Sequence, residues 1–171
     1  MWRKSNLIAL CLIVFIIGIV IPPANACYNF NYMADGKLTG YGNAPSAKIV
    51  SGYWSVTVTK EGVVSFRAFY VEKNLDAIVE NSPVGSYDQL WYKNTDYSDV
   101  QITGNTLVFR CHLNITKLWT KMDWTKEWVY LPAGGNPYII IDSKGFWLDR
   151  APFGVVQGWD ILGTTNHIKI K

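Results

Sequence analysis

The sequence predicts a single all-β domain, built either as an antiparallel β-sandwich of jelly-roll type or as a flattened barrel. Apolar and polar residues alternate with a period of two along many segments after residue 26, whereas long segments with helical periodicity are missing from the pattern. Gly, Asn and Pro clusters separate these short segments, as turns between strands do. Because no helical crossover is predicted between strands, we expect antiparallel pairing.

Residues 1–26 are predicted to be a signal peptide. Arg3 and Lys4 precede an apolar run over residues 7–21, and Ala24-Asn25-Ala26 provides a cleavage site. A membrane-spanning helix needs about 20 apolar residues, which makes an uncleaved N-terminal anchor the less favoured alternative. We therefore expect a secreted or extracellular-surface domain over residues 27–171, with no membrane span after cleavage.

The predicted mature domain is nearly neutral. Without Arg3 and Lys4 it has 14 basic and 13 acidic side chains, a net charge of +1. A nucleic-acid-binding domain would need a clustered basic face, so we expect no nucleic-acid partner. Neither a repeat nor a linker-like stretch divides residues 27–171, whose length is that of one domain.

The clearest hairpin is predicted over residues 53–70. Lys60-Glu61-Gly62 separates two alternating segments, and a three-residue loop with Gly in the last position is typical of a turn closed by a G1 bulge. The implied register places large residues against small ones. The predicted cross-strand pairs are Val58 with Val64, Val56 with Phe66, and Trp54 with Ala68.

A second hairpin is predicted over residues 100–116, with a two-residue turn at Gly104-Asn105. Its register would place Asp99 opposite Arg110 on the outer face. Cys111 falls in the apolar phase and His112 in the polar phase, so their side chains point to opposite sides of the sheet. The two residues therefore cannot act as a catalytic thiolate–imidazole pair. The other predicted pairs are Thr103 with Thr106, Ile102 with Leu107, and Val100 with Phe109.

The remaining strands are predicted from shorter alternating segments. Leu75, Ile78 and Val79 have helical spacing, so residues 74–81 are expected to form a short helical turn or a loop. In the terminal segment, Ile168 and Ile170 take the core phase and His167 faces outward. The expected strands lie at 37–42, 86–93, 127–131, 137–142, 146–149, 155–161 and 167–171.

Asn114 is the predicted modification site. Asn114-Ile115-Thr116 is an N-glycosylation sequon, and the strand phase places Asn114 on the outer face, where glycosylation requires it.

Catalytic and metal-binding motifs are sparse. The only histidines are His112 and His167, and no Cys-x-x-Cys pair accompanies them, so no metal site is predicted. The segment at 40–45 lacks the third glycine of a dinucleotide fingerprint, and no cofactor is expected. A glycosidase would need two carboxylates about 5–10 Å apart across a cleft, which sequence spacing cannot establish here. The scattered carboxylates considered are Asp88, Asp96, Asp99, Glu127, Asp142, Asp149 and Asp160.

A ligand- or partner-contact surface is predicted at the tryptophans of residues 117–128. Trp119, Trp124 and Trp128 lie among charged and polar residues there, and Trp is favoured at interaction hot spots. Residues 86–97 contain a similar mixture, with Tyr87, Trp91, Tyr92 and Tyr97. Such rings stack on sugar rings or anchor a protein interface.

The two cysteines of the mature domain leave three outcomes open. Cys27 and Cys111 would form a disulfide in an oxidising compartment, although Cys27 falls in the polar phase of its segment. Cys27 is also the first mature residue, which a lipoprotein would acylate, but Ala24-Asn25-Ala26 is a poor lipobox. The third outcome is two free thiols.

Four segments of the chain resemble a group of uncharacterised secreted prokaryotic β-domains. They cover about a third of the chain and consist of residues 36–42, 100–111, 134–149 and 162–171. The resemblance implies a β-sandwich fold without known catalytic residues. We therefore expect a secreted or cell-surface module with a non-catalytic binding or structural role, whose partner is an extracellular polysaccharide or a cell-envelope protein. The alternative is a small extracellular carbohydrate-active enzyme that uses Asp or Glu carboxylates.

Overall fold

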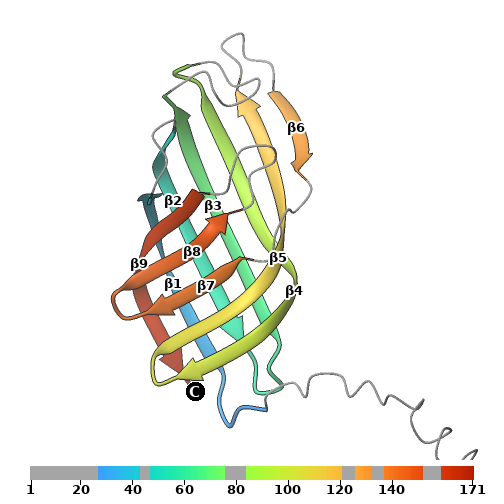
Figure 1. Cartoon of the computed structure of the whole chain (residues 1–171), viewed down its shortest axis with the longest axis vertical. Helices are drawn as coiled ribbons and strands as arrows, with labels where there is room; N and C mark the ends of the chain where they lie inside the picture. Colours follow the sequence, from blue (N-terminus) through green and yellow to red (C-terminus); the bar gives the residue numbers. More distant parts are fainter. Residues whose placement is uncertain (1–26, 43–46, 76–83, 121–125, 132–136, 152–158) are drawn as a thin grey trace, which may run out of the picture.

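The computed structural model shows an antiparallel all-β domain (Figure 1). It describes residues 27–42, 47–75, 84–120, 126–131, 137–151 and 159–171. Within these ranges every regular element is a strand, as predicted. The strands are β1 (Tyr32–Tyr41), β2 (Ala47–Val58), β3 (Val64–Asn74), β4 (Tyr87–Thr103), β5 (Thr106–Thr120), β6 (Lys126–Leu131), β7 (Tyr138–Asp142), β8 (Gly145–Ala151) and β9 (Trp159–Ile170).

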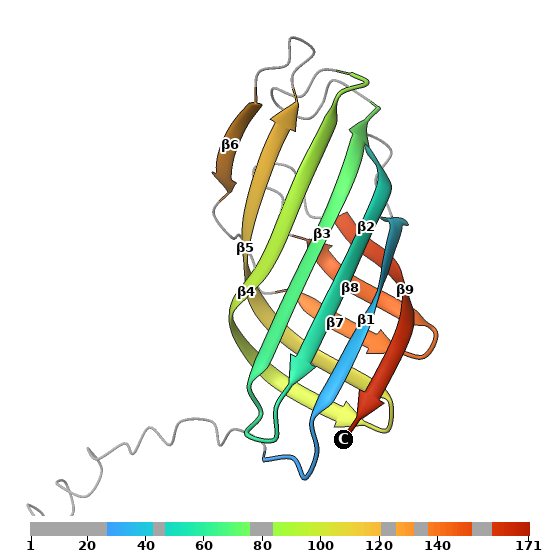
Figure 2. The same ribbon diagram turned by 180° about the vertical axis from the view of Figure 1, so that it is seen from behind.

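The strands close into a barrel. Their order is β4-β3-β2-β1-β9-β8-β7-β5-β6, and β4 also pairs with β5, so eight strands form the closed wall. Among the described strands, β6 pairs only with the second half of β5, while the first half of β5 pairs with β7. Of the two predicted architectures the structure shows the barrel, and it does not divide into the two stacked sheets of a sandwich (Figures 1 and 2).

The β2–β3 hairpin has the predicted register. Val58 pairs with Val64, and Trp54 pairs with Ala68. Gly62 ends the connecting loop at a φ of 78°, a left-handed conformation that glycine adopts without a steric penalty. Local pattern and turn chemistry were therefore sufficient to define this hairpin.

The β4–β5 hairpin departs from its predicted register beyond the first pairs. Thr103 and Ile102 pair as expected, but a bulge between Ser98 and Gln101 places Ser98 opposite Arg110. Asp99 adopts a φ of 53° within the bulge. Its carboxylate still lies 3.4 Å from the Arg110 guanidinium. Bulges bend and twist a strand, and the long β4–β5 hairpin curves strongly at this end of the barrel (Figure 1).

Other predicted elements differ in extent. β1 begins at residue 32 rather than 37, and one strand, β9, replaces the two predicted at 155–161 and 167–171, although residues 152–158 lie outside the described ranges. Most of the predicted helical turn also lies outside them, as does the signal peptide. Ile168 and Ile170 pair with the interior residues Ala34 and Tyr32, as their phase predicted, but Ile170 is 41% exposed because it lies at the end of β9.

Aromatic rings fill the barrel interior around Trp54. The Trp54 indole stacks on Phe146 with a centroid distance of 4.8 Å, and Phe146 lies parallel to Phe66 at 5.9 Å. The indole N–H donates a hydrogen bond to the Thr164 carbonyl at 3.1 Å, which satisfies the polar end of a buried ring. One tryptophan thus links β2, β8 and β9 through the core.

Two glycines make room for that indole. A Cβ atom at Gly36 would lie 1.8 Å from the Thr164 carbonyl oxygen and 2.8 Å from Trp54 Nε1. A Cβ atom at Gly163 would lie 2.4 Å from the Lys37 carbonyl oxygen and 3.2 Å from the same nitrogen. The close approach of β1, β2 and β9 therefore requires glycine at both positions.

Asn94 replaces strand pairing where β4 turns away from β3. Its Oδ1 accepts a hydrogen bond from the Phe66 amide at 2.7 Å, and its Nδ2 donates to the Val64 carbonyl at 3.1 Å. Backbone groups need such partners when burial removes them from water. The side chain of Asn94 therefore continues the β3 ladder past the last backbone pair, Arg67 with Lys93.

We predict that Gly36→Ala destabilises the barrel by about 1–3 kcal/mol or more, because the added methyl overpacks the core. Gly40→Ala is the matched control on the same strand, since a Cβ atom there meets nothing within 4 Å. Urea unfolding followed by circular dichroism should show a lower midpoint for Gly36→Ala only. Equal midpoints for the two variants would contradict the packing described for Trp54.

We also predict that stability falls at alkaline pH. Burial, with a smaller contribution from Asp142, raises the pKa of Tyr32 to about 12, and burial raises the pKa values of Tyr41, Tyr70 and Tyr92 as well. An unfolded tyrosine has a pKa of about 10. The contribution of these protonated tyrosines to the free energy of unfolding is therefore complete below about pH 10, and it is lost as pH rises toward the pKa values of the folded state.

Urea midpoints at pH 8, 10 and 11.5, with tyrosinate absorbance at 295 nm, measure this effect. Exposed tyrosines should ionise first and the remainder together with unfolding. Tyr32→Phe removes one of the buried titrating groups, so its urea midpoint should decrease less between pH 8 and 11.5 than the midpoint of the wild type does. A midpoint that is unchanged between pH 10 and 11.5 would exclude the predicted linkage.

Candidate functional site

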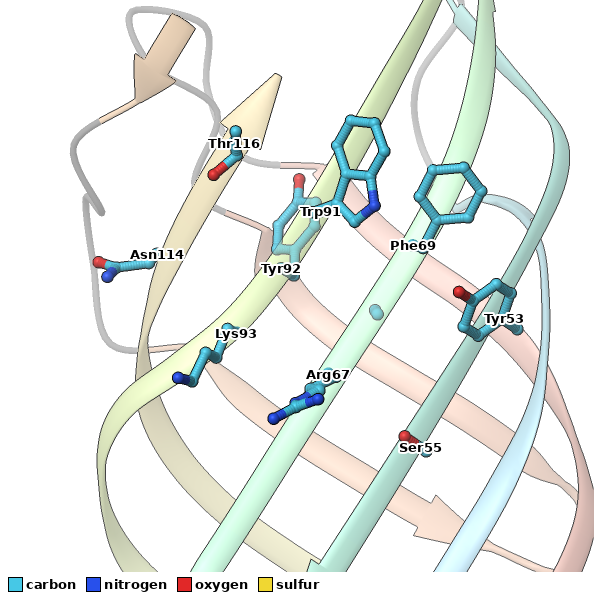
Figure 3. A pocket seen from close by; sticks show the side chains of 10 residues that line it. Tyr53, Ser55, Arg67, Phe69, Trp91, Tyr92, Lys93, Asn114 and Thr116 are labelled. Carbon is cyan, nitrogen blue, oxygen red and sulfur yellow. The ribbon is translucent and has the colours of Figure 1, made fainter. Parts of the chain in front are cut away.

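A row of aromatic side chains crosses the outer face of β2, β3 and β4. Tyr53 pairs with Phe69, and Phe69 pairs with Trp91, so the three residues occupy one rung of the sheet. Their rings are tilted by about 45°, with centroid distances of 5.6 Å from Tyr53 to Phe69 and 4.9 Å from Phe69 to Trp91. Figure 3 shows them side by side, and Tyr53 is 60% exposed. We call these three residues the aromatic row.

A polar row lies beside the aromatic row. Ser55, Arg67, Lys93 and Asn114 occupy the next rung across β2 to β5. Arg67 and Lys93 are exposed, and in the part of the chain that the structure describes neither forms an ion pair with a carboxylate. Their charges are therefore available to a ligand in solution.

The two rows line a groove. It encloses about 600 Å³ and is bounded at the β5 side by Asn114 and Thr116 (Figure 3). None of the described residues that line it is an aspartate or a glutamate. The groove thus offers ring faces for stacking and cationic or amide groups for hydrogen bonding, but no carboxylate for acid–base chemistry.

The aromatic row was not among the predicted contact residues. Its first pair was implied by the predicted register, because a hairpin that pairs Trp54 with Ala68 inside also pairs Tyr53 with Phe69 outside. Trp91 belongs to the aromatic segment noted at residues 86–97. Its position beside Phe69 depends on the β3–β4 pairing, which has no short turn to fix its register.

The predicted contact tryptophans are only partly located. Trp124 lies outside the described residues. Trp119 is in β5, at the register position between Asp88 of β4 and Glu127 of β6, and Trp128 is in β6 opposite Leu118. The side chains of both lie outside the described part of the structure, so their contact role stays a prediction.

Asn114 lies on the outer face, as its strand phase predicted. The side chain is half-buried at the edge of the groove (Figure 3). Its glycosylation stays a prediction.

Both histidines lie outside the barrel and contact carboxylates. His112 Nδ1 is 2.8 Å from Asp96 Oδ1, and His167 Nδ1 is 3.0 Å from Asp35 Oδ1. The hydrogen bond with His112 lowers the pKa of Asp96. Cys111 faces the interior on the other side of β5, so the predicted separation of Cys111 from His112 is confirmed.

The buried carboxylates lie inside the barrel. Glu72 and Asp88 are paired in register on β3 and β4, and both side chains are buried. The Tyr41 hydroxyl donates to Glu72, while Asn74 Nδ2 donates to Asp88 at 2.9 Å and to Ser86 at 3.0 Å. These two carboxylates are neighbours on adjacent strands, and they do not face each other across the outer groove.

The two cysteines of the described residues, Cys27 and Cys111, both have free thiols. Cys27 is exposed at the start of the described chain, whereas Cys111 is completely buried in the core. The disulfide between them, one of the three outcomes left open by the sequence, is not formed in this structure. Burial, with a smaller contribution from Asp96, raises the pKa of the Cys111 thiol to about 12, which disfavours the reactive thiolate.

Among the described residues, no group of three or more His, Cys, Asp or Glu side chains is arranged to hold a metal ion. The same residues form no helix with the length and hydropathy that a membrane crossing needs.

Comparison with known proteins gives no relative: no family model matches the chain, and no curated protein or solved structure is significantly similar to it. The resemblance to secreted prokaryotic β-domains therefore stays a prediction.

We predict that the two thiols differ strongly in reactivity. In the native domain over residues 27–171, a thiol reagent such as dithionitrobenzoate at pH 8 should modify Cys27 rapidly, and Cys111 only after denaturation, because its thiol is buried and protonated. Cys27→Ser, as control, should leave no fast-reacting thiol. Two fast thiols would contradict the burial of Cys111, and no reactive thiol before reduction would show a disulfide.

Proposed function

We propose that the domain is a secreted or cell-surface binding module that holds an extracellular polysaccharide in the groove on β2–β5, without catalysing a reaction. The observation that carries this proposal is the aromatic row, Tyr53, Phe69 and Trp91, on an exposed sheet face. Tyr53 is exposed and Phe69 and Trp91 are half-buried, and a contiguous group of aromatic rings that is open to solvent in this way often marks an interaction site.

The shape and chemistry of the groove support a sugar polymer as the ligand. Each sugar ring has an apolar face that stacks on an aromatic ring and an edge of hydroxyl groups that form hydrogen bonds. The aromatic row supplies the stacking surface, and Ser55, Asn114 and Thr116 supply hydroxyl and amide groups beside it. The groove is open and crosses several strands, so an extended chain can pass through it. An enclosed small-molecule pocket would instead surround its ligand.

Binding without hydrolysis is favoured over the alternative of a carbohydrate-active enzyme. Hydrolysis needs two carboxylates that reach the glycosidic bond, about 5–10 Å apart. The described lining of the groove contains none, and Glu72 and Asp88 lie on the interior side of the same strands. A polymer on the outer face is therefore separated from both carboxylates by the barrel wall.

We predict that Trp91→Ala weakens polysaccharide binding by about 10- to 100-fold, the loss typical of an aromatic hot spot. Trp147→Ala is the matched control, because Trp147 is 36% exposed on β8, a strand that does not line the groove. Affinity electrophoresis of the domain over residues 27–171 through gels with soluble polysaccharides measures retardation for both variants.

The proposal is contradicted if no polysaccharide retards the wild-type domain, or if Trp91→Ala and Trp147→Ala are retarded equally. Circular dichroism of each variant establishes that the barrel is intact. Incubation of the retained polymers followed by a reducing-sugar assay should show no cleavage, and release of reducing ends would support the enzyme alternative.

A further inference from the structure

We infer that the polysaccharide held by the groove is anionic, an inference that rests on the proposed function and specifies its ligand. The observation behind it is the charge of the outer face of β2, β3 and the first half of β4. Lys48, Arg67, Lys73 and Lys93 occupy outward positions of these segments, and no outward position of these segments is an aspartate or a glutamate. The only carboxylates of these segments, Glu72 and Asp88, are buried inside the barrel.

The cations lie on both sides of the aromatic row. Arg67 and Lys93 pair with each other in the rung directly beside it. Lys48 and Lys73 pair with each other two rungs away in the opposite direction, beyond Val71. Because rungs on one face are about 7 Å apart, the two cation pairs span about 20 Å along the strands. A chain that stacks on the aromatic row would therefore extend toward positive charge at both ends.

Among the described residues, no carboxylate forms an ion pair with these cations. Lys48, Arg67 and Lys93 are exposed. Lys73 is half-buried with its ammonium 5.8 Å from the centre of the Tyr87 ring, an arrangement that leaves its charge in place. The face thus carries four positive charges, although the mature domain as a whole has a net charge of only +1.

The wall opposite the groove carries acidic as well as basic side chains, including Lys169 on β9. Asp142, Asp149 and Asp160 occupy outward positions on β7, β8 and β9, the wall opposite the groove (Figure 2). Charge of one sign on one face attracts ligands of the other sign and repels those of like sign. Carboxylate and sulfate groups fit these cations, since arginine binds planar acidic groups in a bidentate manner and lysine acts as a compact point charge.

The decisive experiment compares polymers that differ only in charge. The domain over residues 27–171 is passed through affinity gels that contain polygalacturonate or its fully methyl-esterified form, and heparin or fully desulfated heparin. We expect retardation by at least one acidic polymer and at least fivefold weaker retardation by its neutral counterpart. Retardation by the acidic form should decrease as salt is raised from 20 to 200 mM, because salt screens exposed charges.

Charge variants test whether the groove itself carries the selectivity. The double variant Arg67→Gln/Lys93→Gln should bind the acidic polymer about 2- to 30-fold more weakly, the range for the loss of two exposed charge contacts. The control Lys144→Gln/Lys171→Gln changes the net charge equally at two exposed positions that do not line the groove, and it should bind as the wild type does.

The outcomes separate the two proposals. If neither member of any pair retards the domain, the proposed polysaccharide-binding function fails. If the acidic and neutral forms bind equally and both depend on Trp91, the proposed polysaccharide binding is supported, but the inference that the polysaccharide is anionic is wrong. If acidic polymers bind but the two double variants weaken equally, the attraction belongs to the net charge, and the inference about this groove is overturned.

Discussion

The close approach of three strands around the Trp54 indole is the constraint on which the barrel depends. The indole stacks on Phe146, donates its N–H to the Thr164 carbonyl and occupies the space in front of Gly36 and Gly163. An eight-stranded barrel has an interior that side chains can just fill, so one large ring that links β2, β8 and β9 fixes how near the opposite walls lie. A side chain at either glycine would push backbone against backbone, since the nearest atoms are the carbonyl oxygens of neighbouring strands.

The inward position of Trp54 also fixes the outer face. Side chains on a strand alternate, and a slip of one residue would exchange the two faces completely. With Trp54 and Ala68 paired inside, Tyr53 and Phe69 must pair outside, and the β3–β4 register then brings Trp91 beside Phe69. The groove is therefore a direct consequence of core packing. Its aromatic row lies on three strands of the closed wall, which hold the rings at fixed spacing before any ligand binds, and this lowers the entropic cost of binding.

Sequence patterns predicted the parts of the molecule that local chemistry determines. Both hairpins with short turns had the correct initial register, and Cys111 and His112 point to opposite sides as expected. The alternation pattern did not predict the bulge at Asp99, because this bulge accommodates the curvature of the closed barrel and does not follow from the local residue types. It also missed the ladder role of Asn94 and the row formed by Trp91, which depend on strands joined by a long connection. The composition of residues 117–128 predicted a contact surface at Trp119, Trp124 and Trp128. Strand pairing instead brings together the aromatic row, whose three residues come from three separate segments.

Alternation along β3 and the first half of β4 separates the charges of these two segments by sign. Glu72 and Asp88 face the interior, where Tyr41 and Asn74 hydrogen-bond to their carboxylates. The residues beside them in the chain, Lys73 and Tyr87, face outward and contact each other through the lysine ammonium and the ring. The interior polar cluster and the cationic outer face are thus two sides of the same pair of strands. A shift of one residue in the register would expose Glu72 and Asp88, neutralise the positive charge of the groove and bury Lys73. The same strand phase therefore determines both the polar cluster inside the barrel and the charge selectivity proposed for the outer face.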